Sequence, residues 1–170
     1  MNILSNTQIN ELRQLIDGAQ NIIITCHRSP DGDALGSSLA LSKYLKSMGK
    51  DVNIIIPDAY PDFLMWLPGT QEITRFDKHA DKAEIMIKIS DLIFCLDYNT
   101  ANRVGENMES VLLASKAKKI LIVCAEQPSK CVNWEERDTC ILFGDAAGAV
   151  IVSNEGEDAI FNIGTRYIGA

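Results

Sequence analysis

Long apolar runs are missing from this sequence of 170 residues, as are an excess of basic residues and a regular spacing of cysteines. No apolar run approaches the roughly 18 residues that a membrane-spanning helix needs. The N-terminus has the pattern of an amphipathic helix and not of a secretion signal. The five irregularly spaced cysteines argue against a disulfide or zinc framework. We therefore expect a cytoplasmic protein whose thiols are reduced and mostly buried.

The charge balance is acidic, with 16 Lys and Arg against 23 Asp and Glu and a formal net charge of -7. Such a balance disfavours binding of long nucleic acid through a broad basic surface. We expect a small nucleotide as the partner, and neither long nucleic acid nor a membrane. The sequence does not fix the oligomeric state and is compatible with a dimer. Its share of apolar residues, 46%, is ordinary for a globular chain with one sizeable core.

Short apolar runs alternate with segments of helical periodicity along the chain. Glycines at positions 18 and 49 are expected to end the first two helices. This alternation predicts an α/β fold, a Rossmann-like three-layer sandwich with a mostly parallel sheet and helices on both faces. Residues 57–69, rich in proline, predict an irregular or one-turn helical connection. The expected strands are 21–26, 52–56, 73–76, 91–96 and 119–124, and further helices are expected over 79–89 and 107–115.

Polar side chains follow two of the expected strands. His27, Asp31 and Asp33 come after the strand at 21–26, and Asp97 follows the strand at 91–96. Ligands of open α/β sheets collect at the carboxyl ends of the strands, so these residues are expected to share one crevice. Imidazole and carboxylate are suitable ligands for Mn²⁺ or Mg²⁺. The alternative is that Asp31 or Asp33 merely caps the following helix.

Residues 24–38, with the sequence ITCHRSPDGDALGSS, resemble the first motif of the DHH-family phosphoesterases. Residues 61–69 and 96–100 are similar to later stretches of the bacterial branch that cleaves very short RNA and nucleoside bisphosphates. The resemblance extends from the first helix to about residue 120. It implies a two-metal site with Mn²⁺ or Mg²⁺, in which paired ions assist phosphate hydrolysis.

The resemblance also implies a role for each residue of that site. His27 and Asp31 would hold one ion, Asp33 the other, and Asp97 would bridge both.

The triplet Asp-His-His for which the family is named is missing. Its expected place, at the end of the strand over 119–124, is taken by Val123, Cys124 and Ala125. The second ion thereby loses a histidine ligand. Cys124 and Glu126 are the candidate substitutes, although a thiolate suits zinc better than Mn²⁺.

A second resemblance begins near residue 121. Residues 121–126 and 134–152 are similar to 3-oxoacyl-[acyl-carrier-protein] synthase III, an enzyme of the thiolase fold. The motif with that family's catalytic cysteine is absent here, and its histidine and asparagine would lie beyond Ala170. The cysteines of this segment are therefore not expected to be nucleophiles. We expect a helix over 138–147 and a strand over 148–153 that continue the same sheet.

Three minor features of the sequence can each be explained by structure without a role in function. Phe63 and Trp66 either line a base-stacking cleft or form a buried staple under the proline-rich connection. His79 is expected on the solvated face of a helix. The glycine-rich stretch 144–148 lacks the Lys and Ser or Thr of a phosphate loop, so close packing explains its small residues.

The sequence thus predicts a single domain with a DHH-like part, residues 1–120, and a thiolase-fold-like βαβ segment, residues 121–170. The expected function is a chimeric scaffold with a remnant divalent-metal site and no catalysis. The alternative is a Mn²⁺-dependent phosphoesterase that acts on short oligoribonucleotides or nucleoside bisphosphates. A weaker alternative is a binding module for a nucleotide or an acyl chain.

Overall fold

The computed structural model describes residues 6–98, 100–117, 119–126, 146–153 and 160–161, with the last three ranges described as backbone. Its helices are α1 (Asn6–Gly18), α2 (Gly32–Ser47), α3 (Ala80–Lys88) and α4 (Glu106–Leu113). Short 3-10 helices are η1 (Asp62–Leu64), η2 (Thr70–Glu72) and η3 (Ala101–Val104). The strands are β1 (Asn21–Cys26), β2 (Asp51–Ile56), β3 (Thr74–Arg75), β4 (Leu92–Leu96), β5 (Lys119–Glu126), β6 (Ala146–Ser153) and β7 (Ile160–Phe161).

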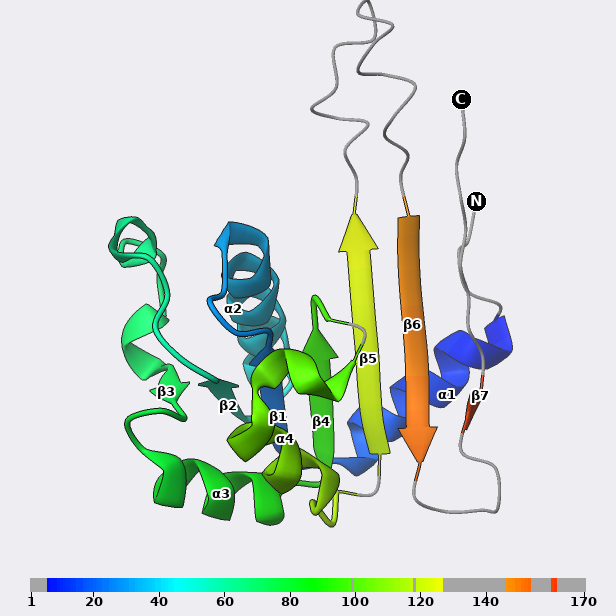
Figure 1. The fold of residues 1–170 in the computed structure, drawn as a ribbon. Coiled ribbons are helices and arrows are strands. Elements are labelled where there is room, and N and C mark those ends of the chain that lie inside the picture. The colour runs from blue at the N-terminus through cyan, green and yellow to red at the C-terminus, as the bar shows by residue number, and fades with distance from the viewer. Residues whose placement is uncertain (1–5, 99, 118, 127–145, 154–159, 162–170) are drawn as a thin grey trace, which may run out of the picture.

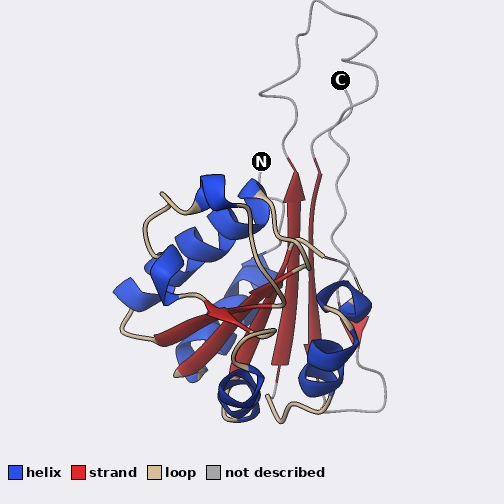
Figure 2. Ribbon diagram, turned by 60° about the vertical axis from the view of Figure 1, so that its left-hand side comes forward, coloured by secondary structure: helices blue, strands red, loops and turns tan. Residues whose placement is uncertain are grey.

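The strands form one sheet in the order β3-β2-β1-β4-β5-β6-β7 (Figure 1). The first five are parallel, whereas β6 is antiparallel to both β5 and β7. Helices lie on both sides of the strands (Figure 2). The predicted Rossmann-like α/β fold with a mostly parallel sheet is therefore confirmed.

The strands are apolar throughout because successive side chains enter two different cores. Ile22 and Ile24 of β1 belong to the core beneath α2, together with Leu35 of that helix. Ile23, which lies between them, belongs to the core on the other face together with Ile87 of α3. Each of these five side chains is at most 2% exposed. The burial explains why a short continuous apolar run forms a central strand here.

Each face of the sheet has its own helices. Leu12 and Ile16 of α1 pack against the core that α2 covers. Met108 and Leu112 of α4 join α3 over the opposite core. All of the helices and parallel strands expected up to residue 126 are present, with ends that differ by a few residues. Among the described residues, no helix has the length and apolar character needed to cross a bilayer.

A local prediction needs correction. The helix expected over 138–147 falls largely outside the described residues, but Ala146 and Ala147 belong to β6, so its predicted end is wrong. The strand expected over 148–153 is confirmed as part of β6, in the same sheet as β5. The division of the chain near residue 120 stays a prediction.

Candidate metal centre

Three of the four predicted ligands meet at the carboxyl end of the parallel strands. β1 and β4 are neighbours, and their last residues, Cys26 and Leu96, are partners in register. The residues that follow these partners therefore lie side by side. His27 Nε2 lies 3.2 Å from Asp97 Oδ2 and 3.7 Å from Asp31 Oδ1, and one ligand atom from each residue lies within 4.8 Å of the others.

The orientation of His27 is fixed by its other ring nitrogen. Nδ1 lies 2.7 Å from the carbonyl oxygen of Arg28, which can only accept a hydrogen bond, so Nδ1 carries the proton. In the neutral ring Nε2 then presents a lone pair to the carboxylate of Asp97. Two acceptors at 3.2 Å repel each other unless a proton or a cation lies between them. The hydrogen bond from Nδ1 to the carbonyl oxygen of Arg28 is the usual kind of contact by which proteins orient a metal-binding histidine.

Asp31 has two roles at once. Its Oδ1 accepts a hydrogen bond of 3.3 Å from the backbone N–H of Ala34, which makes Asp31 the N-cap of α2. The same oxygen is the one that faces His27. A hydrogen bond with the carboxyl group of Asp33 is the main cause that lowers the pKa of Asp31. The capping alternative is thus correct for Asp31, and it does not exclude the contact with His27.

Asp33 does not join the group of three. It lies in the first turn of α2, and its carboxyl group faces that of Asp31. The hydrogen bond with Asp31 is the main cause that raises the pKa of Asp33. The structure therefore places this predicted ligand next to the cluster, as a partner of one of its members.

Asp97 has an unusual backbone conformation. Its φ of 61° lies in the left-handed region, where Asp is better tolerated than most residues. Ser29, in the loop after β1, has a φ of 49°, and these are the two described residues other than glycine with a positive φ. Such conformations cost free energy and are concentrated at functional sites. Asp97 belongs to the cluster of His27, Asp31 and Asp97, and Ser29 lies in the loop between His27 and Asp31.

Asp58 is a residue that the sequence analysis missed. It follows β2, and its Oδ1 accepts a hydrogen bond of 2.6 Å from the backbone N–H of Ser29. Its Oδ2 lies 3.7 Å from Nε of Arg28. Asp58 therefore holds the loop that carries His27. The strand-end rule that identified Asp97 applies equally to Asp58 and could have found it.

Cys124 and Glu126, the predicted substitute ligands, belong to β5. Because β5 is parallel to β4 and Val123 is the partner of Leu96, the backbone of residues 124–126 continues past β4 at the same edge of the sheet. Their side chains lie outside the described part of the structure. Their role as ligands stays a prediction.

The cysteines are buried where the structure describes them. Cys26 and Cys95 are outside any disulfide and have exposed fractions of 0% and 5%. Burial raises the pKa of Cys26 to about 12, so its thiolate is not available as a ligand or nucleophile. The prediction of reduced, buried thiols is confirmed for these two residues, and the other three lie outside the described side chains.

The aromatic side chains of the proline-rich connection are exposed and do not form the buried staple that was one of the two predictions. Phe63 is 72% exposed and Trp66 is 75% exposed, so neither is buried under it. Leu64, at 7% exposure, is the residue that enters the core. The staple interpretation is therefore wrong. His79 is exposed at the start of α3, as expected.

Comparison with known proteins supports similarity to one family over the last part of the chain. The family model of 3-oxoacyl-[acyl-carrier-protein (ACP)] synthase III matches residues 106–168. Beta-ketoacyl-[acyl-carrier-protein] synthase III of Aquifex aeolicus is 47% identical over 58 residues, 34% of this chain and 18% of that protein. The enzyme of Clostridium botulinum (strain Okra) is 48% identical over 60 residues, 35% of this chain and 18% of that protein. This chain spans about a fifth of the length of these relatives.

A solved structure is similar over a larger share of the chain. It is an exopolyphosphatase-related protein from Bacteroides fragilis, with a TM-score of 0.67 and 38% identity. The match covers 69% of this chain and 34% of that protein. The predicted similarity of the C-terminal segment to the synthase is confirmed, and it begins near residue 106, earlier than expected. The name of the Bacteroides fragilis protein agrees in part with the predicted resemblance of the N-terminal part of the chain to phosphoesterases.

Proposed function

We propose that the chain is a chimeric α/β scaffold that binds one divalent cation, Mn²⁺ or Mg²⁺, through His27, Asp31 and Asp97, and that it has little or no hydrolytic activity. The position of His27 carries this proposal. Its Nε2 faces the carboxylates of Asp31 and Asp97, while Nδ1 is held by the carbonyl oxygen of Arg28.

The donor set fits such an ion. Carboxylate oxygens and an imidazole nitrogen are ligands that Mn²⁺ accepts, and Mg²⁺ prefers the oxygens. At bond lengths of about 2.1 Å, ligand atoms of an octahedral ion lie about 3.0 to 4.2 Å apart. The separations of 3.2 and 3.7 Å at His27 fall in this range. The three groups therefore need only small movements to share one ion.

The residues differ in what they would contribute. His27 and Asp97 are held by strand ends and would set the position of the ion, whereas Asp31 is held by the start of α2. A bound ion would polarise a phosphoryl oxygen. Asp33, whose carboxyl group faces that of Asp31, would lie beside the ion's ligands and not form a second complete site.

Hydrolysis is expected to be weak because the groups for a second ion are few. Val123, Cys124 and Ala125 stand where the resemblance implies Asp, His and His. Loss of one preorganised electrostatic group typically lowers kcat by about two to three powers of ten. Several such groups are replaced together here, so the loss should be larger.

A Mn²⁺-dependent phosphoesterase is the second candidate function. It is favoured by the similarity to the exopolyphosphatase-related protein, which is 38% identical over the matched part. The substrates would be short oligoribonucleotides or nucleoside bisphosphates. A nucleotide-binding or acyl-binding module, with no chemistry, is the third.

Calorimetric titration with Mn²⁺ and an assay of phosphate release from a nucleoside 3′,5′-bisphosphate test the proposal together. We expect one Mn²⁺ per chain, loss of this binding in Asp97→Asn, and no phosphate release above background. Asp81→Asn is the matched control, because Asp81 is an exposed carboxylate in the first turn of α3. Turnover that depends on Mn²⁺ and disappears in Asp97→Asn would instead establish the phosphoesterase. Absence of Mn²⁺ binding would refute the metal site.

A further inference from the structure

The connection between β2 and β3 exposes a group of large apolar side chains. Phe63, Met65 and Trp66 are 72%, 57% and 75% exposed. Large apolar groups that stay in water forgo the free energy of burial, and clusters of them usually mark a binding surface. We call these three residues the aromatic platform.

The platform is held in place by its backbone. Leu64 lies between its members and enters the core beneath α2. Thr70 is buried, and its single hydroxyl proton is shared between the carbonyl oxygens of Met65 and Leu67, which lie 3.1 and 3.0 Å from Oγ1. The N–H of Leu64 donates to Pro61 at 2.9 Å. A ligand that binds here therefore does not have to order the loop first.

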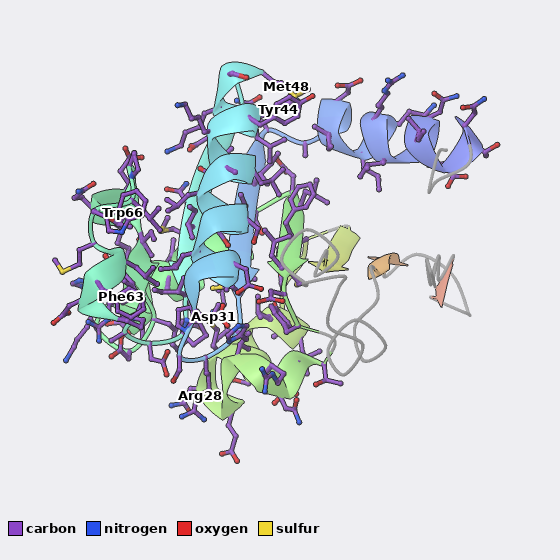
Figure 3. All side chains as sticks on the ribbon, turned by 90° about the horizontal axis from the view of Figure 1, so that it is seen from above. Arg28, Asp31, Tyr44, Met48, Phe63 and Trp66 are labelled. Atoms are coloured by element: carbon purple, nitrogen blue, oxygen red, sulfur yellow. The ribbon has the colours of Figure 1, made fainter. Side chains whose placement is uncertain are left out.

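The platform lies beside the candidate metal centre. A Cβ atom built on Gly32, next to Asp31, would lie 3.9 Å from Cδ2 of Leu64. Figure 3 shows Phe63 beside the end of α2 that carries Asp31, with Trp66 on the same segment. Tyr44 and Met48 are also exposed, but they lie at the opposite end of the helix. Among the exposed rings of the described residues, those of the platform thus lie at the end of α2 that carries Asp31.

We propose that Phe63, flanked by Trp66, stacks on the base of a nucleotide whose phosphate is bound at the metal centre. This inference rests on the proposed metal site, which supplies the positive charge for the phosphate. The planar ring follows from the platform itself, because aromatic side chains stack on the faces of bases without regard to their sequence. A phosphate at the ion and a flat ring beside the end of α2 that carries Asp31 would match the two ends of a nucleotide.

Binding of AMP and of ribose 5-phosphate, which lacks the base, tests the inference by NMR titration in Mg²⁺. We expect AMP to bind about tenfold tighter, because stacking of one base contributes about that factor or more. Phe63→Ala should abolish this preference and leave the affinity for ribose 5-phosphate unchanged. Trp66→Ala should reduce the preference. Tyr44→Ala, which removes an exposed ring at the far end of α2, should leave it intact.

The outcomes separate this inference from the metal site. Equal binding of the two ligands by the wild-type chain, or an unchanged preference in Phe63→Ala, would overturn the platform even if Mg²⁺ binds. Failure of Mg²⁺ binding would count against the metal site, while the base preference measured without Mg²⁺ would still decide the platform. A dimer that dissociates in Phe63→Ala, with AMP binding unchanged, would show that the platform is a contact between copies of the chain.

Discussion

The ends of β1 and β4 differ from the end of their neighbour β5. All three strands are parallel and reach the same edge of the sheet. β1 and β4 are followed by His27 and Asp97, which lie 3.2 Å apart. β5 reaches that edge with Val123, Cys124 and Ala125, of which only the thiol is a metal-binding group.

This difference teaches that the fold and the site place unequal demands on the sequence. Strand β5 can pair with β4 through its backbone whatever polar group follows it. A metal centre requires particular atoms within a few tenths of an ångström. The pairing of β5 with β4 can therefore persist whichever side chains stand at the end of β5.

The largest effect should follow from a change that breaks the fold and leaves the site residues alone. Ile24→Ala removes a side chain that is 0% exposed in the core beneath α2. We expect the free energy of unfolding to fall by about 2 to 4 kcal/mol, through lost burial and the cavity that remains. Denaturant unfolding measures it. Ile85→Ala is the control, because Ile85 is 61% exposed and should cost less than about 0.5 kcal/mol.

Substitution of Asp31 should have the opposite result, a loss of metal binding with little loss of stability. Asn caps helices as well as Asp does, so Asp31→Asn should leave stability within about 0.5 kcal/mol of wild type. It removes a charged ligand, so the Kd for Mn²⁺ should rise at least about tenfold. Asp31→Ala should weaken Mn²⁺ binding to the same extent and also cost about 1 kcal/mol through the lost cap. Equal Mn²⁺ affinity in all three chains would show that Asp31 is only a cap.

A smaller effect is expected at Asp58, which supports the site without joining it. Asp58→Ala removes the acceptor of the Ser29 N–H, a bond of 2.6 Å. The loop that carries His27 should loosen, and the Kd for Mn²⁺ should rise by up to about tenfold, the lower end of the effects of supporting residues on metal affinity. Asp77→Ala is the control: it removes an exposed carboxylate that follows β3 and ion-pairs with Arg75, so it should leave the Kd unchanged.

The smallest effect should come from Ser29→Gly. Ser29 has a φ of 49°, a conformation that glycine adopts without steric strain. Relief of that strain, offset by the greater freedom of glycine in the unfolded chain, should raise stability by about 0.5 kcal/mol. Thermal unfolding measures this change. A loss of stability would mean that the Ser29 side chain contributes more than its backbone strain costs.

The sequence was sufficient for the order of helices and strands up to β5. Central strands such as β1 are short apolar runs, and parallel pairing follows from the helices between them. The meeting of His27 with Asp97 followed from the same rule, since both end parallel strands. The antiparallel direction of β6 was not predictable, because the direction of a strand depends on its partner and not on its own residues.

The wrong predictions concern residues with similar neighbours in the sequence. Packing decides which of these similar side chains is buried or faces the site, and the sequence pattern does not reveal it. Phe63, Leu64, Met65, Trp66 and Leu67 are all apolar, and no periodicity reveals that Leu64 enters the core while its neighbours stay in water. Asp31 and Asp33 are alike in sequence. Their positions relative to His27 are decided by the start of α2, which turns Asp31 toward the ring as its N-cap.

The most direct test of the account is a crystal structure of the chain with Mn²⁺ and its anomalous scattering. We predict one anomalous peak, bonded to Nε2 of His27 and to carboxylate oxygens of Asp31 and Asp97, at the edge where β1 and β4 end. The peak should vanish in crystals of Asp97→Asn. No peak at this edge under saturating Mn²⁺, or a peak that does not contact His27, would contradict the proposed metal centre.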